Sequence, residues 1–424
     1  MSDQVLEAET APSKSKPAKA SRRGDGGETV FGIIAAIAVC HGLNDMMQSL
    51  LPAIYPEFKA NFGLTFGQIG LVTLCYQITA SILQPLIGYY ADKRPTPMAL
   101  PGGALFSLAG LAILSFAHSY GVILVGACIL GIGSAVFHPE ASRVARMAAG
   151  PQPGLAQAMF QVGGNVGSAI GPLAAAIFVV RFGQPSLRVF ALLALISVTI
   201  LWNVGVWYKH HGLARLKAGA KGRAAHPPVP KGKAALGLAI LVALIFSKFV
   251  YLASISSYFT FYLIHQFGAS VQTAQLHLFV FLAAVAVGTI LGGPLGDRLG
   301  RKTVIWFSIL GALPFTLLLP HVDLFWTGPL AIVIGLILAS AFPAIVVFAQ
   351  ELAPGNVGMV AGLCFGLSFG LGGIGAAVLG RVADLEGIAF VYHVCAFLPA
   401  LGLLAAFLPR LPKHEQPNHE KVRA

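Results

Sequence analysis

The sequence has few charged residues: they make up 10% of its 424 residues, against about 25% in soluble domains. It has only five cysteines, all within apolar segments, and no CxxC or Cys/His spacing of a metal site. An HExxH motif and a glycine-rich phosphate-binding loop are also absent, which argues against a zinc hydrolase and an ATP-driven pump. By contrast, 56% of the residues are hydrophobic, with a mean hydropathy of +0.77. These features predict a polytopic membrane protein.

Apolar segments long enough to cross a bilayer as helices recur along the chain. The first, about 25 residues long, exceeds the 7–15 of a signal-peptide core, so we interpret it as a retained membrane helix. Turn and charge signals divide the chain into twelve predicted spans, at about 31–55, 66–91, 98–118, 120–142, 154–180, 186–208, 235–262, 271–295, 303–320, 326–350, 357–380 and 388–409.

The lysines and arginines predict the orientation of these spans. If the N-terminus is cytoplasmic, most of the 28 lysines and arginines fall in the tails and in the loops on the inner side, as the positive-inside rule requires. We therefore predict that both termini are cytoplasmic and that the net charge of +12 interacts with lipid headgroups. A nucleic-acid partner is not needed to explain this charge.

A basic, Gly/Pro-rich segment separates two halves of six predicted spans each. The predicted organisation is a disordered cytoplasmic tail, a six-helix bundle, a basic cytoplasmic linker, a second six-helix bundle and a cytoplasmic tail, at 1–29, 30–208, 209–233, 234–410 and 411–424. GIGSAVFHP and GLILASAFP align at an offset of 204 residues, and two Gly/Asp loops align at 205. The sequence thus predicts an all-α membrane protein of twelve helices in two pseudo-symmetric bundles, with the cargo site between them.

The loop GPLGDRLGRK, 293 to 302, repeats in weaker form as GYYADKR in the first half. Its glycines permit close helix contact, and its charged residues can pair across the halves. We interpret it as a cytoplasmic gate, although a basic loop that only sets topology would look similar. The predicted gate residues are Asp92, Arg94, Asp297, Arg298 and Arg301.

Asp45 lies within the first predicted span, where a carboxylate costs about 2.5–3.5 kcal/mol on insertion scales. His41, Asn44 and Gln48 share its helix face. Burial favours the neutral form of a carboxyl group, so Asp45, tuned by His41, is predicted to load and release a proton. A structural hydrogen-bonded carboxyl is the alternative.

Lys248 lies inside the seventh predicted span, 203 residues after Asp45, near the position that the repeat makes equivalent. Pairing with Asp45 and binding of an anionic cargo group are both open, as is snorkelling to the inner interface. Tyr251 and Tyr258 follow at helical spacing and are candidate aromatic walls of the same site.

Other polar residues recur at helical spacing within predicted spans. Gln77, Gln157 and Gln161 either line the cargo cavity or form interhelical hydrogen bonds. In FHPEASRVAR, Glu140 and Arg143 lie one turn apart and can pair. This segment is interpreted as a charge cluster of the gate or as a direct cargo contact through Arg143, while His138 and Glu140 are also candidate proton carriers.

Several segments resemble the fosmidomycin-resistance branch of the major facilitator superfamily: HGLNDMMQSLLPAIYP, LTFGQIGLVTLCYQ, LQPLIGYYADKRP and FHPEASRVARMA. The resemblance implies a proton-driven exporter in the bacterial inner membrane, with the phosphonate fosmidomycin as its cargo. GGNVGSAIGP, 163 to 172, resembles the span-five motif of drug–proton antiporters, although ordinary close packing would use the same glycines. Ala127 stands where the family often has an arginine, so coupling through that arginine does not carry over.

We therefore expect a monomeric, proton-coupled exporter of small anionic compounds that works by alternating access, without a cofactor or a metal. A proton-coupled importer of a small metabolite is the alternative within the class. A membrane enzyme using His41, His138 and Glu140 is the alternative outside it, and the different depths expected for these residues argue against it.

Overall fold

The computed structural model describes residues 28–64, 66–174, 178–214 and 229–411. Every regular element within these ranges is helical. Most of the two predicted tails and the middle of the predicted linker lie outside the described residues.

The first half contains six long helices, joined by short turns and by the small helices α2 (Tyr55–Phe62) and α7 (Val180–Phe182). The long helices are α1 (Phe31–Ala53), α3 (Phe66–Lys93), α4 (Ala99–Ser115), α5 (Tyr120–Ala148), α6 (Pro153–Ala174) and α8 (Leu187–Trp207). Each corresponds to one of the first six predicted spans.

The second half repeats this arrangement with three of its spans divided into shorter helices. Its elements are α10 (Lys231–Phe267), α11 (Val271–Leu299), α12 (Arg301–Leu310) with α13 (Leu313–Leu318), α14 (Leu324–Ala339) with α15 (Ala341–Leu352), α16 (Val357–Glu386), and α17 (Ile388–Cys395) with a 3-10 segment (Leu398–Phe407). In the described chain, ten segments are long and apolar enough to cross a membrane. Helices α4 and α6 stand at the predicted third and fifth spans, so the fold has the twelve helices expected.

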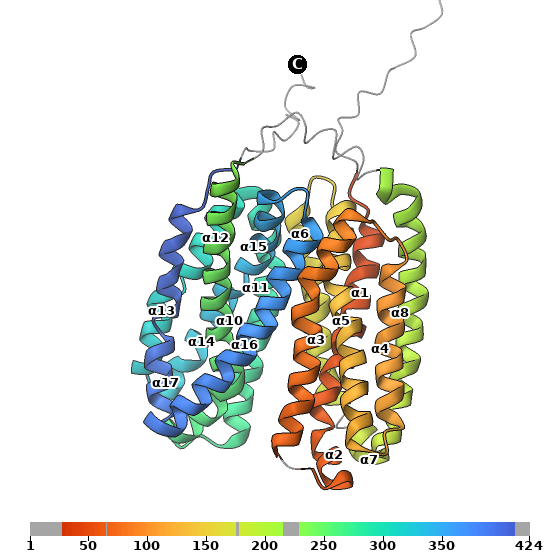
Figure 1. Cartoon of the computed structure of the whole chain (residues 1–424). Helices are drawn as coiled ribbons and strands as arrows, with labels where there is room; N and C mark the ends of the chain where they lie inside the picture. Colours follow the sequence, from red (N-terminus) through yellow and green to blue (C-terminus); the bar gives the residue numbers. More distant parts are fainter. Residues whose placement is uncertain (1–27, 65, 175–177, 215–228, 412–424) are drawn as a thin grey trace, which may run out of the picture.

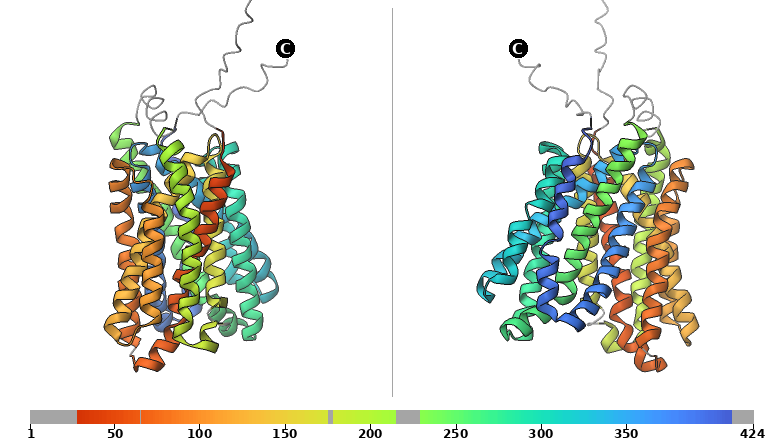
Figure 2. Two further views of the ribbon diagram at one scale, coloured as in Figure 1. Left: turned by 90° about the vertical axis from the view of Figure 1, so that its right-hand side faces the viewer. Right: turned by 60° about the vertical axis from the view of Figure 1, so that its left-hand side comes forward.

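The two halves stand side by side with their helices roughly parallel to one axis (Figure 1). The halves meet at the end where α3 and α11 finish, at Lys93 and Leu299, and they spread apart towards the other end (Figures 1 and 2). We call the end where the halves meet the basic end, and the end where they separate the open end. Separation at one end only is the shape that alternating access requires.

Glycines set how closely the helices approach. A β-carbon at Gly163 would overlap the carbonyl oxygen of Ala38, and one at Gly167 would overlap that of Gly42. The α1–α6 contact inside the first half therefore depends on the glycine ridge of α6. Between the halves, Gly88 of α3 lies against the backbone of Gly358 in α16.

Candidate functional site

Three titratable side chains converge inside the first half. His41 and Asp45 lie one turn apart on α1, and His138 comes from α5. His41 Nε2 lies 3.3 Å from Asp45 Oδ2, His138 Nε2 lies 3.5 Å from Asp45 Oδ1, and the two Nε2 atoms lie 3.3 Å apart. All three residues are buried, with exposed fractions of 2%, 7% and 0% for His41, Asp45 and His138. We call them the His–Asp–His cluster.

Backbone contacts determine which ring nitrogens face the centre of this cluster. His41 Nδ1 lies 2.6 Å from the carbonyl oxygen of Phe160, and His138 Nδ1 lies 3.0 Å from that of Ser134. A carbonyl only accepts, so each Nδ1 carries the proton and donates it. In the neutral rings, both Nε2 lone pairs then face the Asp45 carboxylate. Three acceptor groups this close repel one another unless they share a cation, so the arrangement can hold a proton or a metal ion.

Asn44 and Gln48 extend this polar face of α1. Asn44 Nδ2 donates to Asp45 Oδ1 over 3.1 Å. Gln48 Oε1 accepts from Tyr76 at 2.5 Å and from Ser134 at 3.1 Å, while its buried Nε2 has no partner among the described residues. The expected single-helix face is therefore part of a network that also includes α3 and α5.

Lys248 is buried in the second half, with 3% of its surface exposed. Its Nζ lies 3.4 Å from the carbonyl oxygen of Ala339, which lacks a helical donor because residue 343 is proline. The ammonium also lies 5.0 Å from the ring centroid of Phe342 and 5.2 Å from that of Phe249. Asp45 contacts the two histidines instead of Lys248. Because the Lys248 side chain is buried, it does not snorkel to the inner interface.

Aromatic rings connect the lysine to the cluster across the two halves. Phe342 lies 5.5 Å from Phe365 of α16 between ring centroids, and Phe365 lies 5.3 Å from His138. Phe369, also on α16, lies 5.4 Å from His138 and is 39% exposed. The second half thus covers the cluster with two phenylalanines, and any movement of α16 changes this cover.

The other predicted cargo residues take different positions. Gln157 accepts from Ser142 over 3.0 Å, and the Nε2 atoms of Gln157 and Gln161 have no partner among the described residues. Gln77 is half-buried on α3. Tyr251 lies in the core of the second half, while Tyr258 donates to the Ala376 carbonyl over 2.6 Å. Both tyrosines therefore pack helices within the second half in this conformation.

The predicted gate aspartates bind helix N-termini of the opposite half. Asp92 accepts from the backbone N–H groups of Gly358 and Met359, both over 2.9 Å. Asp297 accepts from Gly154 and Leu155, both over 3.0 Å. Each carboxylate thus caps the first turn of α16 or α6, where the helix dipole also favours negative charge. The two caps are related by the internal repeat and join the halves at the basic end.

Buried charges surround these caps. Arg143 NH1 lies 3.6 Å from Asp92 Oδ1 and 3.7 Å from Glu140 Oε1, and Arg143 also donates to the hydroxyl of Tyr208. The Glu140 oxygens accept no hydrogen bond within the described residues. Arg143 therefore lies beside the Asp92 cap at the basic end.

Two predicted gate arginines point elsewhere. Arg94 is exposed, with its guanidinium over the ring of Tyr90 at 5.8 Å, and Arg298 is exposed. Arg301 instead contacts Asp297 Oδ1 at 3.4 Å and Glu351 Oε1 at 3.2 Å. Arg301 rather than Arg298 therefore lies beside the Asp297 cap in this conformation, and a gate role for Arg94 and Arg298 stays a prediction.

Comparison with known proteins assigns this fold to a family. The model of the Major Facilitator Superfamily matches residues 37–374 and 240–424. The chain belongs to the major facilitator superfamily. Within it, the chain is 55% identical over 381 residues to the fosmidomycin resistance protein of Escherichia coli (strain K12), which covers 90% of this chain and 93% of that one. It is therefore a member of the fosmidomycin-resistance family, a multi-pass membrane transporter and not an enzyme. The bacterial relatives imply an inner membrane.

A second relative agrees with this assignment, and a solved structure shares the fold. An uncharacterised transporter of the superfamily from Bacillus subtilis (strain 168), YfnC, is 41% identical over 384 residues, covering 90% of this chain and 94% of that one. Among solved structures, the E. coli fucose:proton symporter FucP has a TM-score of 0.69 and 16% identity, covering 89% of this chain and 98% of that chain. The latter similarity shows the fold alone.

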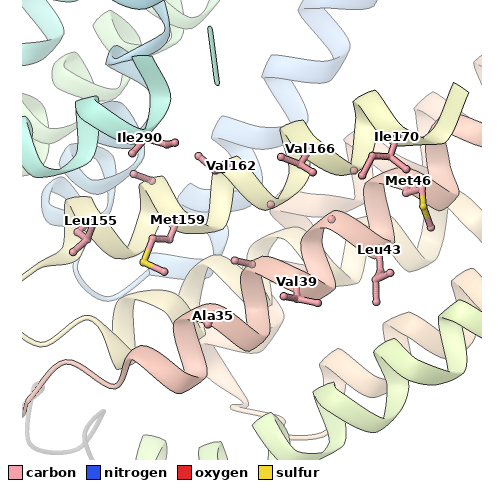
Figure 3. A pocket seen from close by; sticks show the side chains of 15 residues that line it. Ala35, Val39, Leu43, Met46, Leu155, Met159, Val162, Val166, Ile170 and Ile290 are labelled. Atoms are coloured by element: carbon pink, nitrogen blue, oxygen red, sulfur yellow. The ribbon is translucent and has the colours of Figure 1, made fainter. Parts of the chain in front are cut away.

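An apolar groove of about 570 Å³ lies between α1 and α6 of this transporter (Figure 3). Val39 and Leu43 of α1, Met159 and Val166 of α6, and Ile290 of α11 line it. None of the lining residues that the structure describes has a charged or hydrogen-bonding side chain. The groove therefore suits an acyl chain better than an anion, and it is separate from the His–Asp–His cluster.

Sequence reasoning missed several residues of these sites. Glu351 receives contacts from Arg146 of the first half and Arg301 of the second, at 3.5 and 3.2 Å. Gln350, its neighbour, donates across the halves to Ser142 over 3.1 Å. The only signal in the sequence was two adjacent polar residues at the end of an apolar span, which is equally typical of an ordinary helix terminus.

Proposed function

We propose that this transporter exports small anionic compounds of the fosmidomycin type in exchange for protons. The observation that carries the proposal is the convergence of three acceptor side chains in the His–Asp–His cluster. One proton placed between Asp45 and the Nε2 atoms of His41 and His138 relieves their repulsion. Loss of the proton restores that repulsion. The proton-loaded and the unloaded cluster are therefore stable in different surroundings.

Lys248 supports an anionic cargo. The ammonium is buried, and its interactions in the described structure are with a backbone carbonyl and two aromatic rings. An oxyanion would supply the charge that these contacts lack. The unpartnered amide donors of Gln48, Gln157 and Gln161 are available for further cargo oxygens. The name of the E. coli relative, a fosmidomycin resistance protein, supports fosmidomycin as a cargo.

The conformation fits the outward-facing stage of the proposed cycle, with the basic end in the cytoplasm. Asp92 and Asp297 hold that end closed, and Phe365 and Phe369 cover the cluster from the second half. Opening the basic end moves α16 relative to α5 and so exposes the cluster to the other side of the membrane. Glu140, buried beside Arg143, is proposed as a proton relay beneath the gate.

Membrane energetics favour exchange in this direction. A potential of 100 mV is worth about 2.3 kcal/mol per charge. Both the exit of an anion from a negative interior and the entry of a proton are downhill. Since about 1.4 kcal/mol corresponds to tenfold in concentration ratio, each charge moved sustains roughly a 40-fold gradient.

The test uses purified protein in liposomes that contain a pH-sensitive dye, with the membrane potential clamped by potassium and an ionophore. Fosmidomycin is added outside. Exchange for protons predicts that the lumen becomes more alkaline, whereas uptake with protons predicts that it becomes more acidic. No pH change while labelled fosmidomycin enters would show that transport is not coupled to protons.

The variant Asp45→Asn keeps the size of the side chain and removes its charge. We expect it to lose the pH response while still exchanging labelled for unlabelled fosmidomycin, because that exchange requires no net proton movement. Asp384→Asn, at an exposed aspartate near the end of α16, is the matched control and should behave as wild type. A full pH response from Asp45→Asn would refute the role of the cluster.

A further inference from the structure

We propose that His41, Asp45 and His138 form a binding site for a divalent transition-metal ion of the zinc class. Zinc binds histidine nitrogen and carboxylate oxygen at about 2.0–2.2 Å, usually with tetrahedral geometry. Bonds of that length separate two tetrahedral ligands by about 3.3–3.5 Å. In the cluster, the two Nε2 atoms lie 3.3 Å apart, and they lie 3.3 Å from Asp45 Oδ2 and 3.5 Å from Asp45 Oδ1, for His41 and His138 in turn. One ligand atom from each of the three residues can be chosen so that all lie within 4.8 Å of one another.

The orientation of the histidine rings agrees with metal binding. Metal-bound histidines almost always donate their other ring N–H to a carbonyl or a carboxylate, which fixes the tautomer and the ring orientation. Here Phe160 O and Ser134 O accept from the Nδ1 atoms of His41 and His138 at 2.6 and 3.0 Å. The ring of Phe160 also stacks on that of His41, with centroids 4.0 Å apart. Both Nε2 lone pairs are thus directed towards one point before a metal arrives.

The donor set selects the class of metal. Calcium and magnesium require six or more oxygen ligands, whereas two imidazoles and one carboxylate suit zinc, cobalt and their neighbours. Three protein ligands leave the fourth tetrahedral position for water. Asp45 retains an exposed fraction of 7%, the largest in the cluster.

This site goes beyond the proposed export, since it depends on neither the cargo nor the direction of transport. The same three side chains cannot bind a metal ion and share a proton at the same time. Bound zinc would therefore block proton transfer and hold α1 against α5, which makes the ion an inhibitor of a proton-coupled cycle.

The experiment measures metal binding to the full-length protein in lipid nanodiscs, after removal of any polyhistidine tag. Cobalt is titrated first, because four-coordinate Co²⁺ absorbs visible light far more strongly than six-coordinate Co²⁺. We expect one such Co²⁺ per chain, displaced by one equivalent of Zn²⁺. X-ray absorption of the zinc form should then show two imidazoles at about 2.0–2.1 Å.

Variants distinguish the cluster from adventitious sites. His138→Gln and Asp45→Asn should each weaken cobalt binding by about 100-fold or more and remove the four-coordinate spectrum. The control is the double variant of His321 and His393 to Gln, an exposed pair with ring centroids 5.2 Å apart, which should keep the full signal. Size-exclusion profiles and melting temperatures confirm that each variant is folded.

Two results would overturn the metal site. The first is a wild-type protein whose cobalt spectrum is six-coordinate or absent. The second is tight binding that survives in His138→Gln and is lost in the surface double variant. Neither result bears on proton-coupled export, which the liposome experiment tests without metal.

Discussion

The two aspartate caps at the basic end make a quantitative prediction about the conformational equilibrium. Asp92→Asn keeps the shape of the side chain but removes its charge and one of its two acceptor oxygens. Asp92 accepts two backbone N–H groups at the start of α16, both over 2.9 Å. A hydrogen bond to a charged group contributes about 1.5–3 kcal/mol, and charge at a helix N-terminus a further ~0.3–1 kcal/mol. We expect the closed basic end to lose about 2 kcal/mol in total.

That loss corresponds to roughly a 30-fold shift of the equilibrium towards the conformation that is open at the basic end. The assay is pulsed electron paramagnetic resonance between spin labels at two exposed residues on opposite halves: Lys93, the last residue of α3, and Arg298, the last but one of α11. In Asp92→Asn, the fraction of molecules with a long distance between the two spin labels, which marks the conformation open at the basic end, should rise from minor to major.

The internal repeat supplies a check on this reasoning. Asp297→Asn removes the equivalent cap, with both hydrogen bonds at 3.0 Å, and should produce a similar shift. The double variant should open the basic end further than either single change, while Asp384→Asn should leave the distances unchanged. A shift below twofold in both single variants would refute the view that these caps hold the halves together.

Two further predictions concern the cargo site and helix packing. Lys248→Met should raise the half-saturating fosmidomycin concentration by about 10- to 150-fold, because one charge-assisted hydrogen bond is lost. The control is Lys233→Met, at an exposed residue near the start of the same helix, which should leave that concentration unchanged. Equal uptake curves for the two variants would contradict the anion site. Gly167→Ala should cost about 1–3 kcal/mol by overpacking and lower the melting temperature, because its β-carbon would overlap the backbone of α1. Gly232→Ala, which has no atom within 4 Å of its added carbon, should leave the melting temperature equal or higher, and a loss as large as that of Gly167→Ala would contradict the packing argument.

The membrane architecture followed from the sequence alone. A helix crossing a bilayer must satisfy its backbone internally and present apolar side chains to lipid, so each span is encoded locally by about 20 residues. The twelve spans could be located for that reason. The repeat also aligned Asp92 with Asp297, although the first copy was expected to be the weaker; both aspartates accept from helix N-termini of the opposite half.

The sites depended on contacts that local sequence does not encode. The spacing of His41 and Asp45 placed them on one face of α1, but the approach of His138 was not predicted. We expected His138 nearer the cytoplasmic edge, and only the packing of α5 on α1 brings its ring within 3.5 Å of the carboxylate. The sequence therefore determined the spans, the repeat and the presence of a buried acid. Tertiary structure decided which partners that acid meets, which helix end each aspartate caps, and that Arg301 rather than Arg298 lies at the gate. The reason is that helix rotation and crossing angles arise from the packing of all twelve helices together.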